Sequence, residues 1–114
     1  MKFVLPMPPG LNSTYGLTRN GGMFKNRIAA EWEELAGWEI KRQRKIKKTY
    51  LGEIKLKIKF FYSRDRDVDA GIKILIDLLE KQRIYNNDSQ VVELFVTKER
   101  DTKYPHAEVE IYET

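Results

Sequence analysis

Four charged residues lie close together in the chain, and their types suit metal-assisted chemistry. Asp67 and Asp69 are two residues apart, Lys73 follows after four residues, and Asp88 lies in a polar turn at residues 85–90. If the chain before Asp69 is extended, both carboxylates leave the backbone on one side. Paired carboxylates with a third acid nearby are the oxygen ligands that Mg²⁺ or Mn²⁺ requires. The spacing therefore permits a small metal site at the start of a helix.

An ordinary structural role competes with this interpretation. Asp69 stands where the N-cap of the following helix is expected, which is worth about 1 kcal/mol, and Asp67 would complement the helix dipole. Two carboxylates about 4 Å apart near a surface repel by roughly 4 kcal/mol, more than the cap contributes. A metal ion would offset this repulsion, and so would Lys73, Arg64 or Arg66. The spacing alone favours a metal site and a capped helix equally.

The position of Asp88 adds a geometrical question. A polar turn before a strand is an ordinary place for an aspartate. The helix expected over residues 70–82 is roughly 20 Å long, so a parallel crossover leaves Asp88 at its far end from Asp69. Residues 83–89 can span roughly 23 Å when extended, which is enough to run back along the helix. Either this loop returns within the subunit, or the acids meet across a dimer interface.

Composition bounds the kind of protein. The 114 residues are enough for one core, so we expect a single domain over residues 1–114. The absence of cysteine and the single histidine, His106, exclude disulfides, thiolate zinc sites and most histidine-based chemistry. A net charge of +4 favours a polyanionic partner. No apolar run approaches the roughly 20 residues of a membrane span, and Pro6 interrupts the N-terminal run too early for a secretory signal. We therefore expect a cytoplasmic protein without membrane contact.

Hydrophobic periodicity predicts an α+β fold with two helices. The expected elements are a strand over residues 2–5, a β ribbon around 15–17 and 23–24, a helix over 26–48, a strand over 53–62, a helix over 70–82, and strands over 91–98 and 107–112. The polar turn at 99–105 indicates that the last two strands form a hairpin. The order β-(β ribbon)-α-β-α-β-β predicts a mostly antiparallel or mixed sheet.

The two expected helices differ in character. Asn26 can cap the first, whose later part is basic, with six basic residues among positions 41–48: Lys41, Arg42, Arg44, Lys45, Lys47 and Lys48. Cations at a helix C-terminus complement its dipole, so a solvated helix end is as well supported as a phosphate-binding one. The second helix is apolar around most of its circumference, which places it deep in the core or at a dimer interface.

Three short motifs follow one another along the chain: Pro8-Pro9-Gly10-Leu11-Asn12 followed by Tyr15, Arg66-Asp67-Val68-Asp69 followed by Lys73, and Asn87-Asp88-Ser89-Gln90-Val91-Val92. In their order and separation they resemble the RusA family of Holliday junction resolvases, small endodeoxyribonucleases common in bacterial and prophage genomes. Two positions depart from the family pattern. Ala70 stands where the family usually has asparagine, and Asn87 where it often has an acid.

The resemblance implies a homodimer that cuts branched DNA, in particular four-way junctions, with Mg²⁺ or alternatively Mn²⁺ and no small-molecule cofactor. Asp67, Asp69 and Asp88 are then the essential carboxylates and metal ligands, and Lys73 is the essential lysine. The candidate DNA contacts are Asn12, Tyr15, Arg66 and the six basic residues of positions 41–48.

Two other functions fit the same charges. The chain could be a non-catalytic nucleic-acid-binding module in which the basic helix end and the lysines of strand 53–62 hold phosphates while the acids only cap a helix. It could also be a dimeric phage structural or adaptor protein, which predicts no salt-sensitive affinity for DNA.

Overall fold

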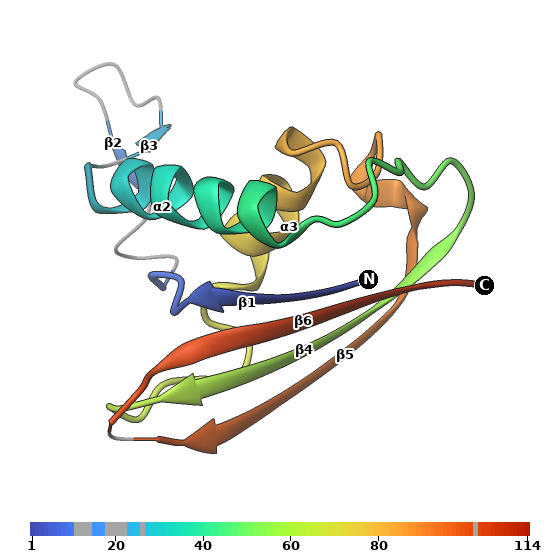
Figure 1. The fold of residues 1–114 in the computed structure, drawn as a ribbon. Coiled ribbons are helices and arrows are strands. Elements are labelled where there is room, and N and C mark those ends of the chain that lie inside the picture. Colours follow the sequence, from blue (N-terminus) through green and yellow to red (C-terminus); the bar gives the residue numbers. More distant parts are fainter. Residues whose placement is uncertain (11–14, 18–22, 26, 102) are drawn as a thin grey trace.

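The structure, a computed structural model, describes residues 1–10, 15–17, 23–25, 27–101 and 103–114. Within these residues, a four-stranded sheet carries two helices on one face (Figure 1). The spatial order of its strands is β1 (Lys2–Pro6), β6 (His106–Glu113), β4 (Ile54–Tyr62) and β5 (Val91–Arg100). The helices are α2 (Arg27–Gln43) and α3 (Ile72–Lys81), and a 3₁₀ helix, η1 (Asp88–Gln90), precedes β5. A separate ribbon pairs β2 (Tyr15–Leu17) with β3 (Met23–Lys25).

The element order confirms the predicted α+β fold and the ribbon. The predicted hairpin of the last two strands is wrong, because β4 lies between β5 and β6. Ile58 of β4 is opposite Val96 of the parallel strand β5 and opposite Val109 of the antiparallel strand β6. A polar turn can join neighbouring strands or strands on either side of a third, so the local sequence does not distinguish the two arrangements.

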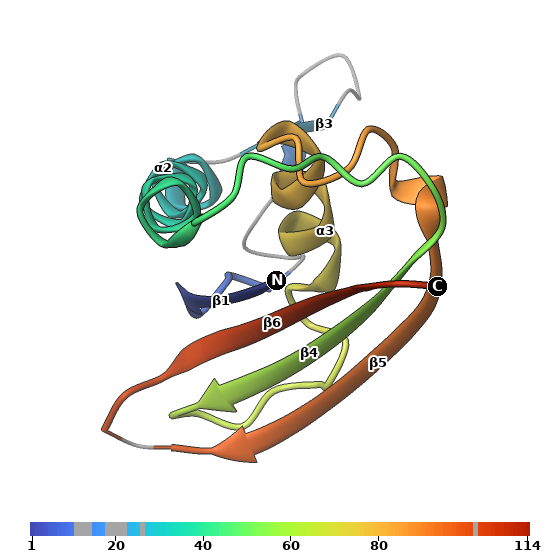
Figure 2. The same cartoon turned by 45° about the vertical axis from the view of Figure 1, so that its right-hand side comes forward.

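The central place of β4 follows from its strict alternation. Ile54, Leu56, Ile58 and Phe60 are each at most 1% exposed, while the intervening lysines lie on the opposite face. The helices cover only the apolar face, with α2 over β1 and α3 nearer β5 (Figure 2). Strands and helices share one core, to which the helices contribute Ala29, Trp32, Ala36, Ile40, Ile74, Leu75, Leu78 and Leu79.

The first helix ends earlier than expected, at Gln43 rather than near Lys48. Arg44 explains the early end, because its guanidinium donates to the carbonyl of Gln82 at 3.0 Å and to that of Arg83 at 3.2 Å. These carbonyl groups follow the end of α3, where acceptors lack helical partners. Arg44 therefore ties the chain after α2 to the end of α3, and most of the basic run lies outside the helix. No helix in the described part of the chain is long and apolar enough to span a membrane.

Candidate active site

The predicted acidic pair lies on an exposed loop between β4 and α3. This loop turns instead of extending, because Ala70 N–H donates to the Asp67 carbonyl at 3.0 Å and Ile72 N–H to the Asp69 carbonyl at 3.2 Å. Asp67 and Asp69 are both exposed. Across the described residues, neither carboxylate accepts a hydrogen bond or forms an ion pair. Both carboxylates are thus accessible to solvent.

The predicted N-cap role of Asp69 is wrong. Gly71 occupies the N-cap of α3 without a side-chain cap, and its φ of 88° lies in the left-handed region that favours glycine. A Cβ on Gly71 would lie 2.8 Å from Pro8 Cγ. The close approach of the N-terminal Pro8 segment therefore fixes the start of α3 and leaves the Asp69 side chain outside the helix.

Arg66 joins the acidic loop to the same N-terminal segment. Its Nη1 donates to the Pro8 carbonyl at 2.8 Å, and its Nη2 is buried with no partner among the described residues. Burial lowers the pKa of this guanidinium, because the charged form loses hydration. Arg66 was a candidate DNA contact. Its position makes it a brace between two segments, and its contact with DNA stays a prediction.

Lys73 is exposed in the first turn of α3, close in the chain to the acidic pair. It projects from the helix, whereas Asp67 and Asp69 precede it on the loop. Asp69 and Lys73 therefore lie at the same end of α3.

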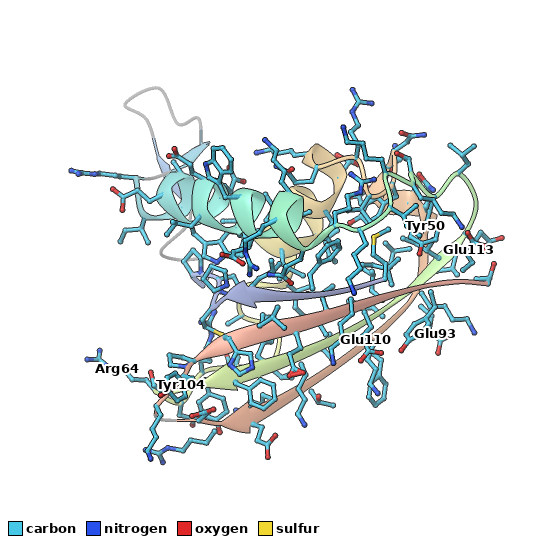
Figure 3. All side chains as sticks on the ribbon, viewed as in Figure 1. Tyr50, Arg64, Glu93, Tyr104, Glu110 and Glu113 are labelled. Carbon is cyan, nitrogen blue, oxygen red and sulfur yellow. The ribbon has the colours of Figure 1, made fainter. Side chains whose placement is uncertain are left out.

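Asp88 lies at the other end of α3. Its backbone N–H donates to Glu80 Oε1 at 2.9 Å, and η1, which contains it, is capped by the Asn87 side chain. Arg64 directly precedes the acidic loop, and Tyr50 forms a β-bridge with Tyr85, which precedes η1. Figure 3 shows Arg64 and Tyr50 at opposite ends of the sheet. The loop after α3 therefore does not return along the helix. No cluster of three acids or histidines able to hold a metal exists among the described residues of one chain.

The surroundings of Asp88 contain acids that the sequence analysis did not select. Glu80 contacts its backbone, and burial together with the charges of Glu80, Asp88 and Asp77 strongly raises the pKa of the Tyr85 hydroxyl. That hydroxyl donates to the Ile76 carbonyl at 2.7 Å. Tyr85 thus stays protonated and fixes the start of the η1 segment against α3. In the sequence, the spacing of Asp77 and Glu80 along the predicted helix was the feature that could have indicated these acids.

A second residue missed by the sequence analysis lies beside the acidic loop. Lys98 Nζ donates to the Arg66 carbonyl at 2.7 Å and to Asp65 Oδ1 at 3.1 Å. In β5, Leu94 and Val96 face the helices, and Lys98 is the next residue of that face, opposite Phe60 of β4. In the sequence, Lys98 could have been recognised because it stands where the alternation of β5 predicts a buried apolar residue.

The basic residues of positions 41–48 have different partners. Arg42 pairs with Glu39 at 2.6 Å, Lys48 pairs with Glu113, and Arg44 binds the carbonyls after α3. Lys45 and Lys47 are exposed.

The lysines of β4 lie on the uncovered face of the sheet, where Figure 3 labels Glu93 and Glu110. Lys55 pairs with Glu93 at 3.1 Å, and Lys59 pairs with Glu99 at 3.0 Å. Acids therefore compensate most of the strand lysines.

Two predicted DNA contacts cannot be placed in the same way. Asn12, like the predicted helix cap Asn26, lies outside the described residues. Tyr15 lies in β2, whose side chains are also outside the description. Their contact with DNA stays a prediction.

Comparison with known proteins links these motifs to one family. The model of the family described as "Endodeoxyribonuclease RusA" matches residues 6–112 of the chain. A relative from Aquifex aeolicus, named crossover junction endodeoxyribonuclease RusA, is 30% identical over 95 residues. That match covers 82% of this chain and 74% of the relative. The family match includes the acidic loop, α3, η1 and Lys98.

Proposed function

The chain belongs to the RusA family of endodeoxyribonucleases, and from this premise we propose that it resolves four-way DNA junctions by metal-dependent paired nicking. The observation that carries the proposal is the exposed pair Asp67 and Asp69. The two carboxylates extend from one short loop, and among the described residues neither forms a hydrogen bond or an ion pair. Such a site on a chain of net charge +4 suits a cation that bridges protein and phosphate.

The donor set fits Mg²⁺ or Mn²⁺. Magnesium in phosphate-processing sites is typically held by one or two carboxylates while substrate oxygens and water complete its coordination. Asp67 and Asp69 would supply the carboxylates. When bound, the metal would lower the pKa of a water ligand and stabilise charge on the phosphate.

The protein's own groups would then orient the DNA strand. Lys73, in the first turn of α3, brings a positive charge to the same end of the helix as the acidic loop. A lysine there can hold a phosphate oxygen as a point charge and stabilise the negative charge that builds during cleavage. The N-terminus of α3 adds a favourable dipole for the same anion.

The third carboxylate is proposed to come from a second copy of the chain. Asp88 lies at the far end of α3 from Asp67 and Asp69, and α3 is about 15 Å long. A two-fold axis across the middle of α3 would place the start of one helix beside the end of its partner. Each of two sites would then receive Asp67 and Asp69 from one protomer and Asp88 from the other.

The edge strand β5 supports such a dimer. β5 has β4 on one side only, and its Val92, Leu94 and Phe95 are 50%, 42% and 57% exposed. An exposed apolar edge is a ready surface for association. Ile72 and Ile76 of α3 are also only partly buried. An isologous contact here would present two sites to a junction whose arms have approximate two-fold symmetry.

A cleavage assay on a synthetic four-way junction tests the proposed function. The parent protein is compared with Asp67→Asn, Asp69→Asn and Lys73→Ala in Mg²⁺ and in Mn²⁺. We expect paired nicks from the parent, and loss of cleavage by at least 100-fold with junction binding retained in the three variants. A parent that binds junctions but cuts none of them with either metal contradicts the proposal and favours the non-catalytic module.

The non-catalytic module has weaker support from the charges. Its phosphate contacts were to include the lysines of β4, but Lys55 and Lys59 are each paired with a glutamate of β5. Pairing neutralises the field that would attract a phosphate chain. The adaptor function has no observation that favours it.

A further inference from the structure

The loop that carries Asp67 and Asp69 is held from the edge strand by Lys98. The Lys98 ammonium donates to the backbone carbonyl of Arg66, the residue immediately before Asp67, at 2.7 Å. The same ammonium donates to Asp65 Oδ1 at 3.1 Å. We propose that Lys98 is a positioning residue of the acidic site, which fixes the backbone from which the two carboxylates extend.

Arg66 is the point where two supports meet. Its carbonyl accepts from Lys98 on β5, while its guanidinium donates to the Pro8 carbonyl at 2.8 Å. Gly71, on the other side of the acidic pair, is packed against Pro8. The loop is therefore fixed at Arg66 and at Gly71, and the five residues 67–71 between Arg66 and α3 include both carboxylates.

The chemistry of the contact favours a positioning role over direct binding of a phosphate. A backbone carbonyl and a carboxylate occupy the ammonium, and the ring of Tyr62 lies 5.3 Å from it. A charge-assisted hydrogen bond to a backbone carbonyl restrains the loop more than a bond between two mobile side chains, because only the lysine must be ordered. Lys98 thus fixes the direction in which Asp67 leaves the loop, which a metal site requires of its ligands.

The inference rests on the proposed function only where it predicts an effect of Lys98 on metal binding. Lys98→Met removes the ammonium and keeps the length and apolar stem of the side chain. Lys55→Met is the matched control, because Lys55 forms an ion pair of the same length, 3.1 Å to Glu93, on the opposite face of the sheet. Lys98→Arg tests rescue, since a guanidinium can still donate to the Arg66 carbonyl.

The first measurement is amide hydrogen exchange in the absence of metal. We expect exchange at Ala70 and Ile72, whose amides bond the Asp67 and Asp69 carbonyls, to be about tenfold faster in Lys98→Met than in Lys55→Met. Lys98→Arg should restore most of the protection. Equal exchange in Lys98→Met and Lys55→Met overturns the proposal.

The second measurement is Mn²⁺ binding by calorimetry, with Asp67→Asn as the baseline, together with junction affinity in EDTA. We expect Lys98→Met to weaken Mn²⁺ binding about tenfold while junction affinity and melting temperature match those of Lys55→Met. A drop in junction affinity in EDTA instead makes Lys98 a phosphate contact and overturns the positioning role. If the parent neither binds Mn²⁺ nor cuts, the proposed function fails, and the exchange comparison still decides the role of Lys98.

Discussion

Asp67 and Asp88 lie at opposite ends of α3 within one chain. Asp67 belongs to the turn before the helix, and the backbone of Asp88 is bonded to Glu80 near the last turn. Both are expected to be essential carboxylates, yet they cannot meet around one ion in a single protomer. The two carboxylates can therefore share one metal site only if they come from different protomers, and mixed dimers test this.

Mixing Asp67→Asn with Asp88→Asn should restore activity that neither variant has alone. If each site combines Asp67 of one protomer with Asp88 of the other, a mixed dimer contains one site with both substitutions and one site with none. We expect the mixture to nick one strand of a junction at a rate approaching that of one parental site, without paired cuts. Sites completed within one chain give no recovery, which would contradict the shared site. A mixture of Asp67→Asn with Asp69→Asn is the control and should stay inactive.

Changing the edge strand should separate the protomers. Leu94 is 42% exposed on the helix-bearing face of β5, and Leu94→Lys would place an ammonium in the proposed interface. We expect a dimer in the parent and a folded monomer in the variant, measured by sedimentation and circular dichroism. Ile46→Lys is the control, because Ile46 is 70% exposed in the segment after α2. A monomeric parent, or a variant that dimerises as tightly as the parent, would show that the dimer does not use this edge.

The start of α3 should be sensitive to one methyl group. In Gly71→Ala the new Cβ would meet Pro8 Cγ at 2.8 Å, and the residue would keep a φ of 88°. Strain and overpacking together should lower the free energy of unfolding by about 2–4 kcal/mol. Gly52→Ala is the control, because a Cβ there meets nothing within 4 Å. Urea denaturation of the two variants measures the difference, and equal stabilities would rule out the close packing against Pro8.

Two lysines after α2 should contribute to the salt dependence of DNA binding. Lys45 and Lys47 are exposed, whereas Lys55 and Lys59 are paired with glutamates. Replacing Lys45 and Lys47 by glutamine should reduce the slope of log K against log salt by about 0.9 for each phosphate that the protein no longer neutralises. The same replacement of Lys55 and Lys59 should leave the slope unchanged. An unaltered slope in the first variant assigns these charges to solubility.

Local patterns predicted the elements that depend on neighbours in the chain. The alternation of Ile54 to Phe60 is sufficient to define a strand with one buried face, and the Asp67 loop and the η1 turn are found where their polar residues indicate. Residue type and motif are sufficient to indicate the candidate acids, whereas their relative positions depend on the fold.

Long-range contacts explain what the sequence did not reveal. The N-cap of α3 is set by Pro8, which is more than sixty positions away in the chain, rather than by the nearby Asp69. The hairpin prediction failed because β4 takes the place between β5 and β6. Lys98 was overlooked because its partners, Asp65 and the Arg66 carbonyl, become neighbours only when β5 pairs with β4.

The short length of α3 has a consequence for the DNA product. In the proposed dimer, each catalytic centre uses both ends of this helix from different protomers, so the ten residues of α3 fix how far apart the two centres lie. That separation selects which phosphates on the two cut strands are reached together. The positions of the paired nicks relative to the crossover point are then a property of helix length, and a one-turn insertion in α3 would move the cuts or uncouple them.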